Sequence, residues 1–228
     1  MGLNRKSVTT INKEGKSILL WSLLLFCAVN TLMFIPFACK WFSYFVLSVS
    51  SGLLLIIINF FRNPKRRFPS EDTEKVVVAP ADGVIVAIEE VDEPDYFHDR
   101  RIVISTFMSV LNVHANWFPV NGLVKKVEHQ KGSFHAAYKA KSSFENERSL
   151  VVIETPEGHE ILVRQIAGAL ARRVVTYPQA GDKCHIDEHL GFIKLGSRVD
   201  IYLPLDSLIC VKMKQKVMAD NTILAKLP

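Results

Sequence analysis

The chain has 228 residues, a net charge of +5 and 49% hydrophobic residues. That length allows one domain with a core of its own plus an appendage. The weak and scattered positive charge argues against a nucleic-acid partner and fits contact with an anionic membrane surface or an acidic substrate. The cysteines Cys27, Cys39, Cys184 and Cys210 form no C-x-x-C pair. The sequence therefore predicts no disulfide framework and no zinc site, and a reducing cytosolic environment suits the soluble part.

Two apolar runs near the start of the chain, 17–38 and 42–61, predict a hairpin of two transmembrane helices over residues 17–61. Each run is close to the ~20 residues that cross a bilayer as a helix. The gap around Pro36, Lys40 and Trp41 predicts a tight turn. A cleaved signal peptide is the alternative for the first run. That run is longer than a typical signal-peptide core, however, and a second apolar run follows it.

Basic residues flank the two chain ends of this hairpin: Arg5, Lys6, Lys13, Lys16, Arg62, Lys65, Arg66 and Arg67. Lys40 is the charge in the turn. Because basic flanks stay in the cytoplasm, we expect a cell-membrane protein with both ends and the following domain on the cytoplasmic side. Residues 1–16 are then a basic cytoplasmic terminus and 62–74 a basic linker. Anionic headgroups would hold such a linker by ~1 kcal/mol per charge.

From residue 75 to residue 228 the chain predicts one compact, mainly β domain, α+β at most. Short β-branched runs alternate with turn signals, which is typical of paired strands. The predicted strands are 76–78, 83–88, 101–104, 150–153, 161–163, 199–203 and 209–213. The predicted turns are 80–83, 121–122, 156–158 and 219–221. We expect little helix, because no long helical period follows residue 70.

Two residues are candidates for acid–base chemistry. Asp82, in the string Pro80-Ala81-Asp82-Gly83, is either an ordinary turn residue or a carboxylate that orients a histidine. His114 is either a hydrogen-bonded histidine at a strand edge or a general acid/base with a pKa near neutrality. His135 is predicted to lie on a surface loop. His185 and His189 are spaced as metal ligands can be, but glycines on both sides indicate a loop, so no metal is predicted.

Near the C-terminus, Gly196-Ser197 is a place where the chain can cut itself. Glycine has no Cβ, so the Ser197 hydroxyl can approach the Gly196 carbonyl. The ester that forms can eliminate to a dehydroalanine, which hydrolyses to a pyruvoyl group. A Gly-Ser pair is common, and by itself it indicates only a turn entering a strand.

Taken together, these strings resemble the short form of the phosphatidylserine decarboxylase family over nearly all of residues 75–215. The family strings P-A-D-G, H followed by P-x-N-G, K-A-S-x-x-N-E-R, Q-I-A-G-x-x-A-R-R and L-G-S-R have counterparts at 80–83, 114–122, 141–148, 165–173 and 195–198. One departure is Trp117, where larger bacterial relatives often carry a second histidine. His114 then serves both in maturation and in turnover, or another group substitutes.

The resemblance implies a proenzyme in which Asp82 and His114 assist Ser197 in attacking Gly196. Cleavage would give a β chain, 1–196, and an α chain, 197–228, whose first residue is the covalent pyruvoyl cofactor made from Ser197. That group would form a Schiff base with phosphatidylserine and release CO2 and phosphatidylethanolamine, with His114 protonating the carbanion.

The remaining implications concern binding. Candidate substrate contacts are Asn146, Glu147, Arg172 and Arg173, with an arginine suited to the phosphodiester. The expected partners are phosphatidylserine and the bilayer, and assembly with a second copy of the chain stays open. Three alternatives stay open: a pyruvoyl decarboxylase of a soluble amine, one acting on another lipid-linked headgroup, and a membrane-anchored β-rich binding module without self-cleavage.

Overall fold

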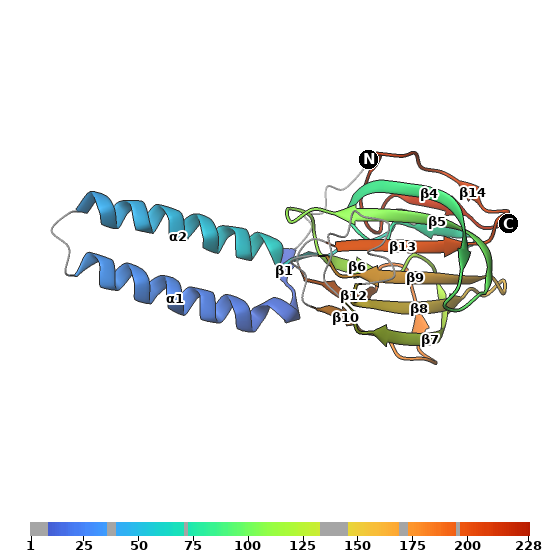
Figure 1. Ribbon diagram of the computed structural model, residues 1–228, viewed down its shortest axis with the longest axis horizontal. Helices are drawn as coiled ribbons and strands as arrows, with labels where there is room; N and C mark the ends of the chain where they lie inside the picture. The colour runs from blue at the N-terminus through green and yellow to red at the C-terminus, as the bar shows by residue number, and fades with distance from the viewer. Residues whose placement is uncertain (1–8, 36–39, 71–72, 133–145, 169–172, 195–196) are drawn as a thin grey trace. The chain divides into compact units, whose positions relative to one another are not determined.

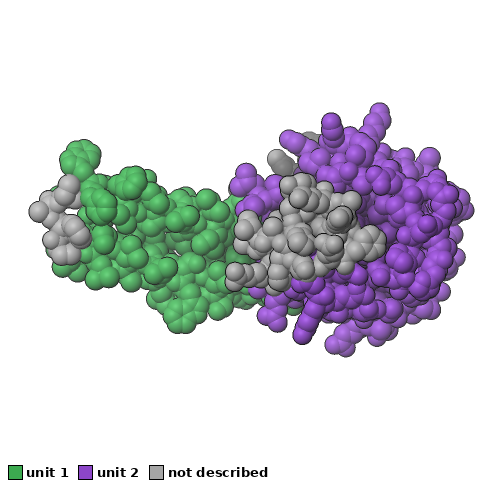
Figure 2. All heavy atoms as spheres, in the orientation of Figure 1, with its two compact units in different colours: residues 1–65 green, residues 66–228 purple. Residues whose placement is uncertain are grey.

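The computed structural model describes residues 9–35, 40–70, 73–132, 146–168, 173–194 and 197–228. These fall into two compact units, residues 1–65 and residues 66–228 (Figure 2). The predicted fold class is confirmed: two apolar helices precede a β-rich domain. The predicted linker 62–74 is divided between the units, since residues 62–65 belong to the first and Arg66 begins the second.

The first unit is a helical hairpin closed at its chain ends by a short ladder (Figure 1). Its elements are β1 (Thr9–Ile11), the 3-10 helix η1 (Lys13–Gly15), α1 (Lys16–Phe34), α2 (Lys40–Phe60) and β2 (Arg62–Pro64). β1 pairs antiparallel with β2. Lys40, expected in the turn, is instead the first residue of α2. Residues 36–39, the rest of that expected turn, lie outside the described residues.

Both helices are long and apolar enough to cross a membrane. Large apolar side chains such as Trp21, Leu25 and Trp41 are exposed. Between the helices, the Asn30 amide donates to Ser50 Oγ at 3.0 Å. Outward apolar side chains with a polar bond between helices are typical of packing in lipid, where apolar contact alone does not drive association. The unit is therefore suited to membrane association.

The second unit is built on an eight-stranded antiparallel sheet that curls into a half-barrel (Figure 1). Its strands in spatial order are β11 (Lys183–Cys184), β7 (Gly122–Gln130), β8 (Arg148–Glu154), β9 (Glu160–Ile166), β13 (Ser197–Leu203), β5 (Asp99–Met108), β4 (Gly83–Glu93) and β15 (Lys216–Val217). Within the described part of this unit there is no helix. β13 lies in the interior of the sheet, paired with β5 on one side and β9 on the other.

Two three-stranded sheets pack with the large one. The first is β10 (Val174–Thr176), β12 (His189–Ile193) and β6 (Ala115–Trp117), and the second is β14 (Leu208–Ile209), β16 (Ile223–Lys226) and β3 (Val76–Val78). One buried cluster joins all three sheets, through side chains such as Ile104, Leu190 and Ala225. A second cluster, which includes Leu162, covers the other face of the large sheet, and Tyr96 and Phe97 pack against it. Burial on both faces explains why several strands are continuous apolar runs rather than alternating ones.

The predicted strand 209–213 was wrong beyond Ile209. Cys210 N–H donates to Leu224 O at 2.8 Å, and then the chain turns through Lys214, whose φ is 65°. Lys214 N–H donates to Ile85 O at 2.8 Å, which delivers the chain to the edge of β4. The predicted turns 156–158, between β8 and β9, and 219–221, between β15 and β16, are confirmed. In 80–83 and 121–122 the last residue, Gly83 or Gly122, is already the first residue of β4 or β7.

Candidate active site

The antiparallel register brings the candidate residues to one end of the large sheet. Ser197, the first residue of β13, pairs with Met108, the last residue of β5. Arg198 and Arg148 both pair with Ile166, so β13 and β8 begin where β9 ends. β4 also begins at this end, because Val84 pairs with Phe107. We call this the site end of the sheet, and the strings around Asp82, Asn146, Gly168 and Ser197 all meet there.

Ser197 is completely buried at the site end. Its hydroxyl donates to Met108 Sδ at 3.2 Å, a weak acceptor that orients the oxygen without engaging it strongly. Met108 Sδ also accepts from the Asn116 amide at 3.7 Å. Gly196, the other half of the expected cleavage site, lies outside the described residues. Ser197 is thus held on a rigid interior strand immediately beside that bond.

His114 is also completely buried and lies next to the segment that leads to Ser197. Its carbonyl accepts from Ile193 N–H at 3.2 Å, four residues before Ser197. Its ring Nδ1 is 3.0 Å from the carbonyl oxygen of Asn112. Because a carbonyl only accepts, Nδ1 carries the proton in the neutral ring, and the basic nitrogen is then Nε2.

Asp82 is paired with an arginine. Arg66 Nη1 donates to Asp82 Oδ1, and Arg66 Nη2 donates to Asp82 Oδ2 at 2.7 Å. Ala219 N–H also donates to Oδ1, at 3.0 Å. Both side chains are only 13% exposed. Among the described residues, then, the ionic partner of Asp82 is Arg66 and not a histidine.

Trp117 connects Asp82 to the segment of His114. Its backbone N–H donates to Pro80 O at 2.9 Å, which ties together the strings 80–83 and 114–122. The buried indole lies 4.8 Å from the Arg66 guanidinium carbon and 4.9 Å from the His189 ring, between centroids. A guanidinium at that distance from an indole is a cation–π contact. Arg66, which the sequence indicated only as one of the basic linker residues, and His189, considered there only as a possible metal ligand, thus both contact Trp117.

A buried polar chain runs behind Ser197. The Gln165 amide donates to Asn116 Oδ1 at 2.7 Å, and Gln165 Oε1 accepts from Thr176 at 3.0 Å. The Thr176 hydroxyl also lies 2.6 Å from the Ser149 hydroxyl, which donates to it when Thr176 donates to Gln165. A satisfied buried network of this kind fixes the orientation of its members. Gln165 lies on β9, and the other members of the chain, Asn116, Ser149 and Thr176, lie on β6, β8 and β10. No local sequence pattern predicts that these residues meet.

The candidate binding residues brace the loops at the site end. The buried Asn146 amide donates to Ala167 O at 2.7 Å, and Glu147 Oε1 accepts from Val174 N–H at 3.1 Å. Arg173 is exposed, and its carbonyl accepts from Lys194 N–H at 3.2 Å. Arg172 lies outside the described residues, as do His135 and residues 141–145.

Two arginines within or next to the matched strings, Arg164 and Arg198, are paired with carboxylates. Arg164, completely buried, is held by Glu93 at 2.8 Å and Asp95 at 2.6 Å. Arg198 pairs with Asp200 at 2.8 Å. These contacts make both residues structural. Of the described residues, no group of three His, Cys, Asp or Glu side chains is placed to hold a metal ion.

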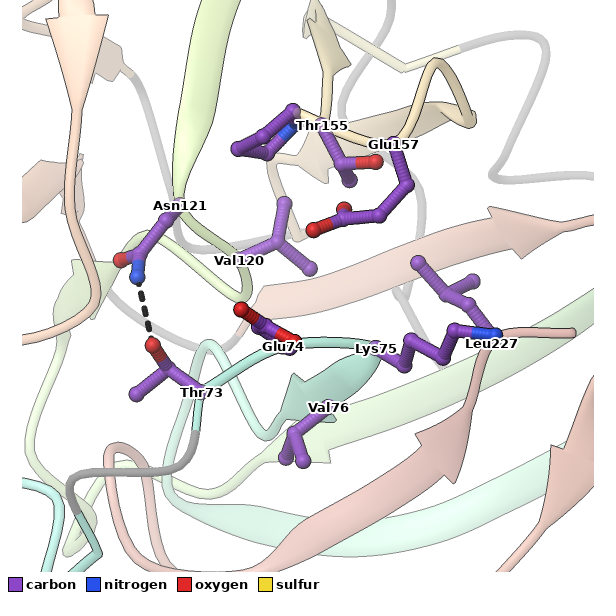
Figure 3. Close-up of a pocket in the computed structure, with 10 residues that line it drawn as sticks. Thr73, Glu74, Lys75, Val76, Val120, Asn121, Thr155, Glu157 and Leu227 are labelled. Atoms are coloured by element: carbon purple, nitrogen blue, oxygen red, sulfur yellow. Dashed lines mark hydrogen bonds between the residues drawn. The ribbon is translucent and has the colours of Figure 1, made fainter.

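Among the hollows that the described residues form near the matched strings, a small one and a larger one bear on the site. One, of about 40 Å³, is bordered by Thr73, Val120 and Asn121, with the Asn121 amide donating to Thr73 at 2.8 Å (Figure 3). It has room for water only. The other is an open cleft of about 450 Å³ beside Asp82, Asn112 and Lys216. A cleft of that size can take a lipid headgroup.

Sequence comparisons define the class of protein. The family model described as phosphatidylserine decarboxylase, a class of pyruvoyl-dependent carboxy-lyases, matches residues 53–225. Proteins named phosphatidylserine decarboxylase proenzyme are 57% identical in Phocaeicola vulgatus and 58% in Bacteroides fragilis, each over 95% of both chains. One from Cytophaga hutchinsonii is 42% identical over 95% of this chain and 98% of its own.

The chain belongs to the phosphatidylserine decarboxylase family. Members of this family make a pyruvoyl group from a serine of their own chain.

Proposed function

We propose that this phosphatidylserine decarboxylase cuts itself between Gly196 and Ser197. The observation that carries the proposal is the position of Ser197, buried at the first residue of an interior strand and beside the segment of His114. Cleavage there gives a β chain, 1–196, and an α chain, 197–228. The two chains stay joined through β13, which pairs with β5 and β9 of the β chain.

Self-cleavage needs a base for the Ser197 hydroxyl. His114 Nε2 takes the proton as Oγ attacks the Gly196 carbonyl carbon, and returns it to the departing amide nitrogen. Asp82 lies at the same end of the sheet, and its charge, balanced by Arg66, helps to hold the string 80–83 against the segment that carries His114. Its salt bridge to Arg66 fixes where that charge lies.

Turnover uses the same residues around the mature site. A pyruvoyl group made from Ser197 supplies the electron sink for loss of CO2 from an amine-bearing headgroup. His114 Nε2 holds the proton that replaces the departing carboxylate on Cα. Burial at the site end keeps bulk water from this position. Asn146 and Glu147 shape the walls, and Arg172 or Arg173 binds the phosphodiester.

The helical hairpin holds the enzyme at the surface where its substrate lies. Both chain ends and the β domain face the cytoplasm in this proposal, because basic residues flank the hairpin. Cys210, which is exposed, reports this orientation. A membrane-impermeant maleimide should leave Cys210 unlabelled in intact cells and label it after lysis. Labelling of Cys210 in intact cells would overturn the orientation. A Cys210→Ser chain measures the labelling that comes from the other cysteines.

The mass of the purified protein tests self-cleavage. The wild-type chain should give two fragments divided between residues 196 and 197, the smaller lighter by one ammonia than its serine-started form. Ser197→Ala should give one uncut chain and no conversion of phosphatidylserine vesicles. Ser207→Ala, a second buried serine of the same fragment, is the matched control and should mature normally.

Three outcomes separate the alternatives. A wild-type chain that stays uncut and inactive on vesicles would favour a binding module. A cut chain that decarboxylates free serine but not vesicles would indicate a soluble substrate. A cut chain that releases CO2 from another lipid-linked headgroup, and not from phosphatidylserine, would overturn the substrate assignment alone.

A further inference from the structure

Arg66 is the first residue of the β-rich unit and six residues beyond the end of α2. It lies outside every string that carries the family resemblance. Its guanidinium nevertheless contacts three separate parts of the site end: the Asp82 carboxylate, the Ala219 carbonyl and the Trp117 indole. We propose that Arg66 is a positioning residue for self-cleavage that holds Asp82 and Trp117 in their working arrangement.

The fork geometry supports the first half of the inference. Two parallel N–H···O bonds fix a carboxylate in position and in plane, which a single ammonium cannot do. Ala219 N–H adds a third bond to Asp82, while Arg66 Nη1 donates to Ala219 O at 3.1 Å. Asp82 comes just before β4 and Ala219 comes after β15, and these two strands pair with each other. Arg66 thus closes a small ring that includes the future α chain.

The indole contact supports the second half. Trp117 is buried, and its ring is the aromatic surface that the Arg66 guanidinium faces. A cation close to that surface stabilises it in place. His189, across the β6–β12 ladder from Trp117, completes the group. Trp117 is three residues from His114, so its position and that of His114 are linked through one short strand.

The inference rests on the proposed role of Asp82, and the experiment tests the role of Arg66 and the role of Asp82 in separate variants. Arg66→Gln, Arg66→Lys and Arg66→Ala are made in the full chain, synthesised with lipid nanodiscs, and the appearance of the α chain is followed by time. Arg67→Gln removes the same charge from the next, exposed residue and is the control. Asp82→Asn and Ser197→Ala test the proposed function separately.

We expect Arg66→Gln to slow self-cleavage by about 10- to 100-fold, the effect of a displaced reacting group. Arg66→Lys should lose less, since it keeps the charge without the fork. The self-cleavage rate of Arg67→Gln should stay within about twofold of the wild-type rate, because solvent screens the exposed Arg67 charge.

Chemical rescue distinguishes positioning from general stability. Guanidinium at millimolar concentration should restore part of the rate of Arg66→Ala, and an equal concentration of KCl should not. Cleavage of Arg66→Gln at the rate of Arg67→Gln would overturn the inference. A slow Arg66→Ala with a lowered melting temperature and no rescue would overturn it as well. If Asp82→Asn matures normally, the role of Asp82 fails and this inference with it, while Ser197→Ala still decides the cleavage site.

Discussion

At the scale of single residues, one carboxyl couples the fold to pH. Asp220 is completely buried, and its Oδ1 accepts from Asp187 N–H at 3.0 Å. Burial, with a hydrogen bond to the Asp187 side chain, raises the pKa of Asp220 to about 7. The folded protein therefore binds a proton that the unfolded chain has released above its ordinary carboxyl pKa. Asp220 lies in the fragment 197–228 and Asp187 in 1–196, so this proton also links the two fragments.

The sign of the pH effect follows from that difference. Between about pH 4 and 7 the folded state holds more protons than the unfolded state, so stability is greatest below this window and falls as pH rises through it. The loss should be about 1–3 kcal/mol across this window. Asp220→Asn, which mimics the neutral form, should be less sensitive to pH in thermal melts. An unchanged pH slope in that variant would contradict this account.

A second residue-scale prediction concerns Arg164, whose charge is wholly enclosed. Removing it in Arg164→Met leaves Glu93, which is also completely buried, without its cation. Breaking such a pair costs about 3–5 kcal/mol. Arg100→Met breaks the exposed pair with Glu90 and should cost at most about 1 kcal/mol. Urea unfolding of both variants in detergent checks the contrast, and equal losses would refute it.

At the scale of elements, the start of β4 allows no side chain. A Cβ on Gly83 would lie 2.2 Å from Phe107 O, so Gly83→Ala must move β4 from β5 and carry Asp82 with it. Gly122→Ala meets the same obstacle at Glu154 O, also 2.2 Å away, where β7 pairs with β8. Both should destabilise the domain, but only Gly83→Ala should slow the appearance of the α chain. Gels over time give the comparison, and equal slowing would count against a special role for the β4 start.

Elements also show what the sequence allows one to predict. The runs that became β8 and β9 were predictable because their apolar residues are continuous and turns bound them. β7 (Gly122–Gln130) was missed, since Lys125 and Lys126 interrupt its pattern at a bulge in the ladder. Asp82, His114 and Ser197 became candidates through motif resemblance. Arg66 and His189 did not, because their role depends on contacts across the fold rather than on any local spacing.

At the scale of the whole molecule, the two units are suited to different surroundings, the helices to lipid and the β-rich unit to water. The helices of residues 16–60 expose apolar side chains, whereas residues 66–228 bury theirs in clusters common to several sheets. We expect residues 66–228, made alone, to stay in the aqueous fraction, because their core is independent of the helices. Sedimentation with and without phosphatidylserine vesicles checks this. Recovery of that fragment only as an aggregate would show that its core needs the first unit.

The interior position of β13 has a consequence for the life of the protein. Before cleavage, folding is unimolecular, and an unfolded chain can refold. After the cut, the same strand belongs to a separate peptide of 32 residues, so refolding becomes a meeting of two molecules whose success falls with dilution. The uncut Ser197→Ala chain should regain its structure after denaturant is removed, while the matured protein should not. Self-cleavage therefore makes folding irreversible in practice, so each copy must fold correctly before it is cut.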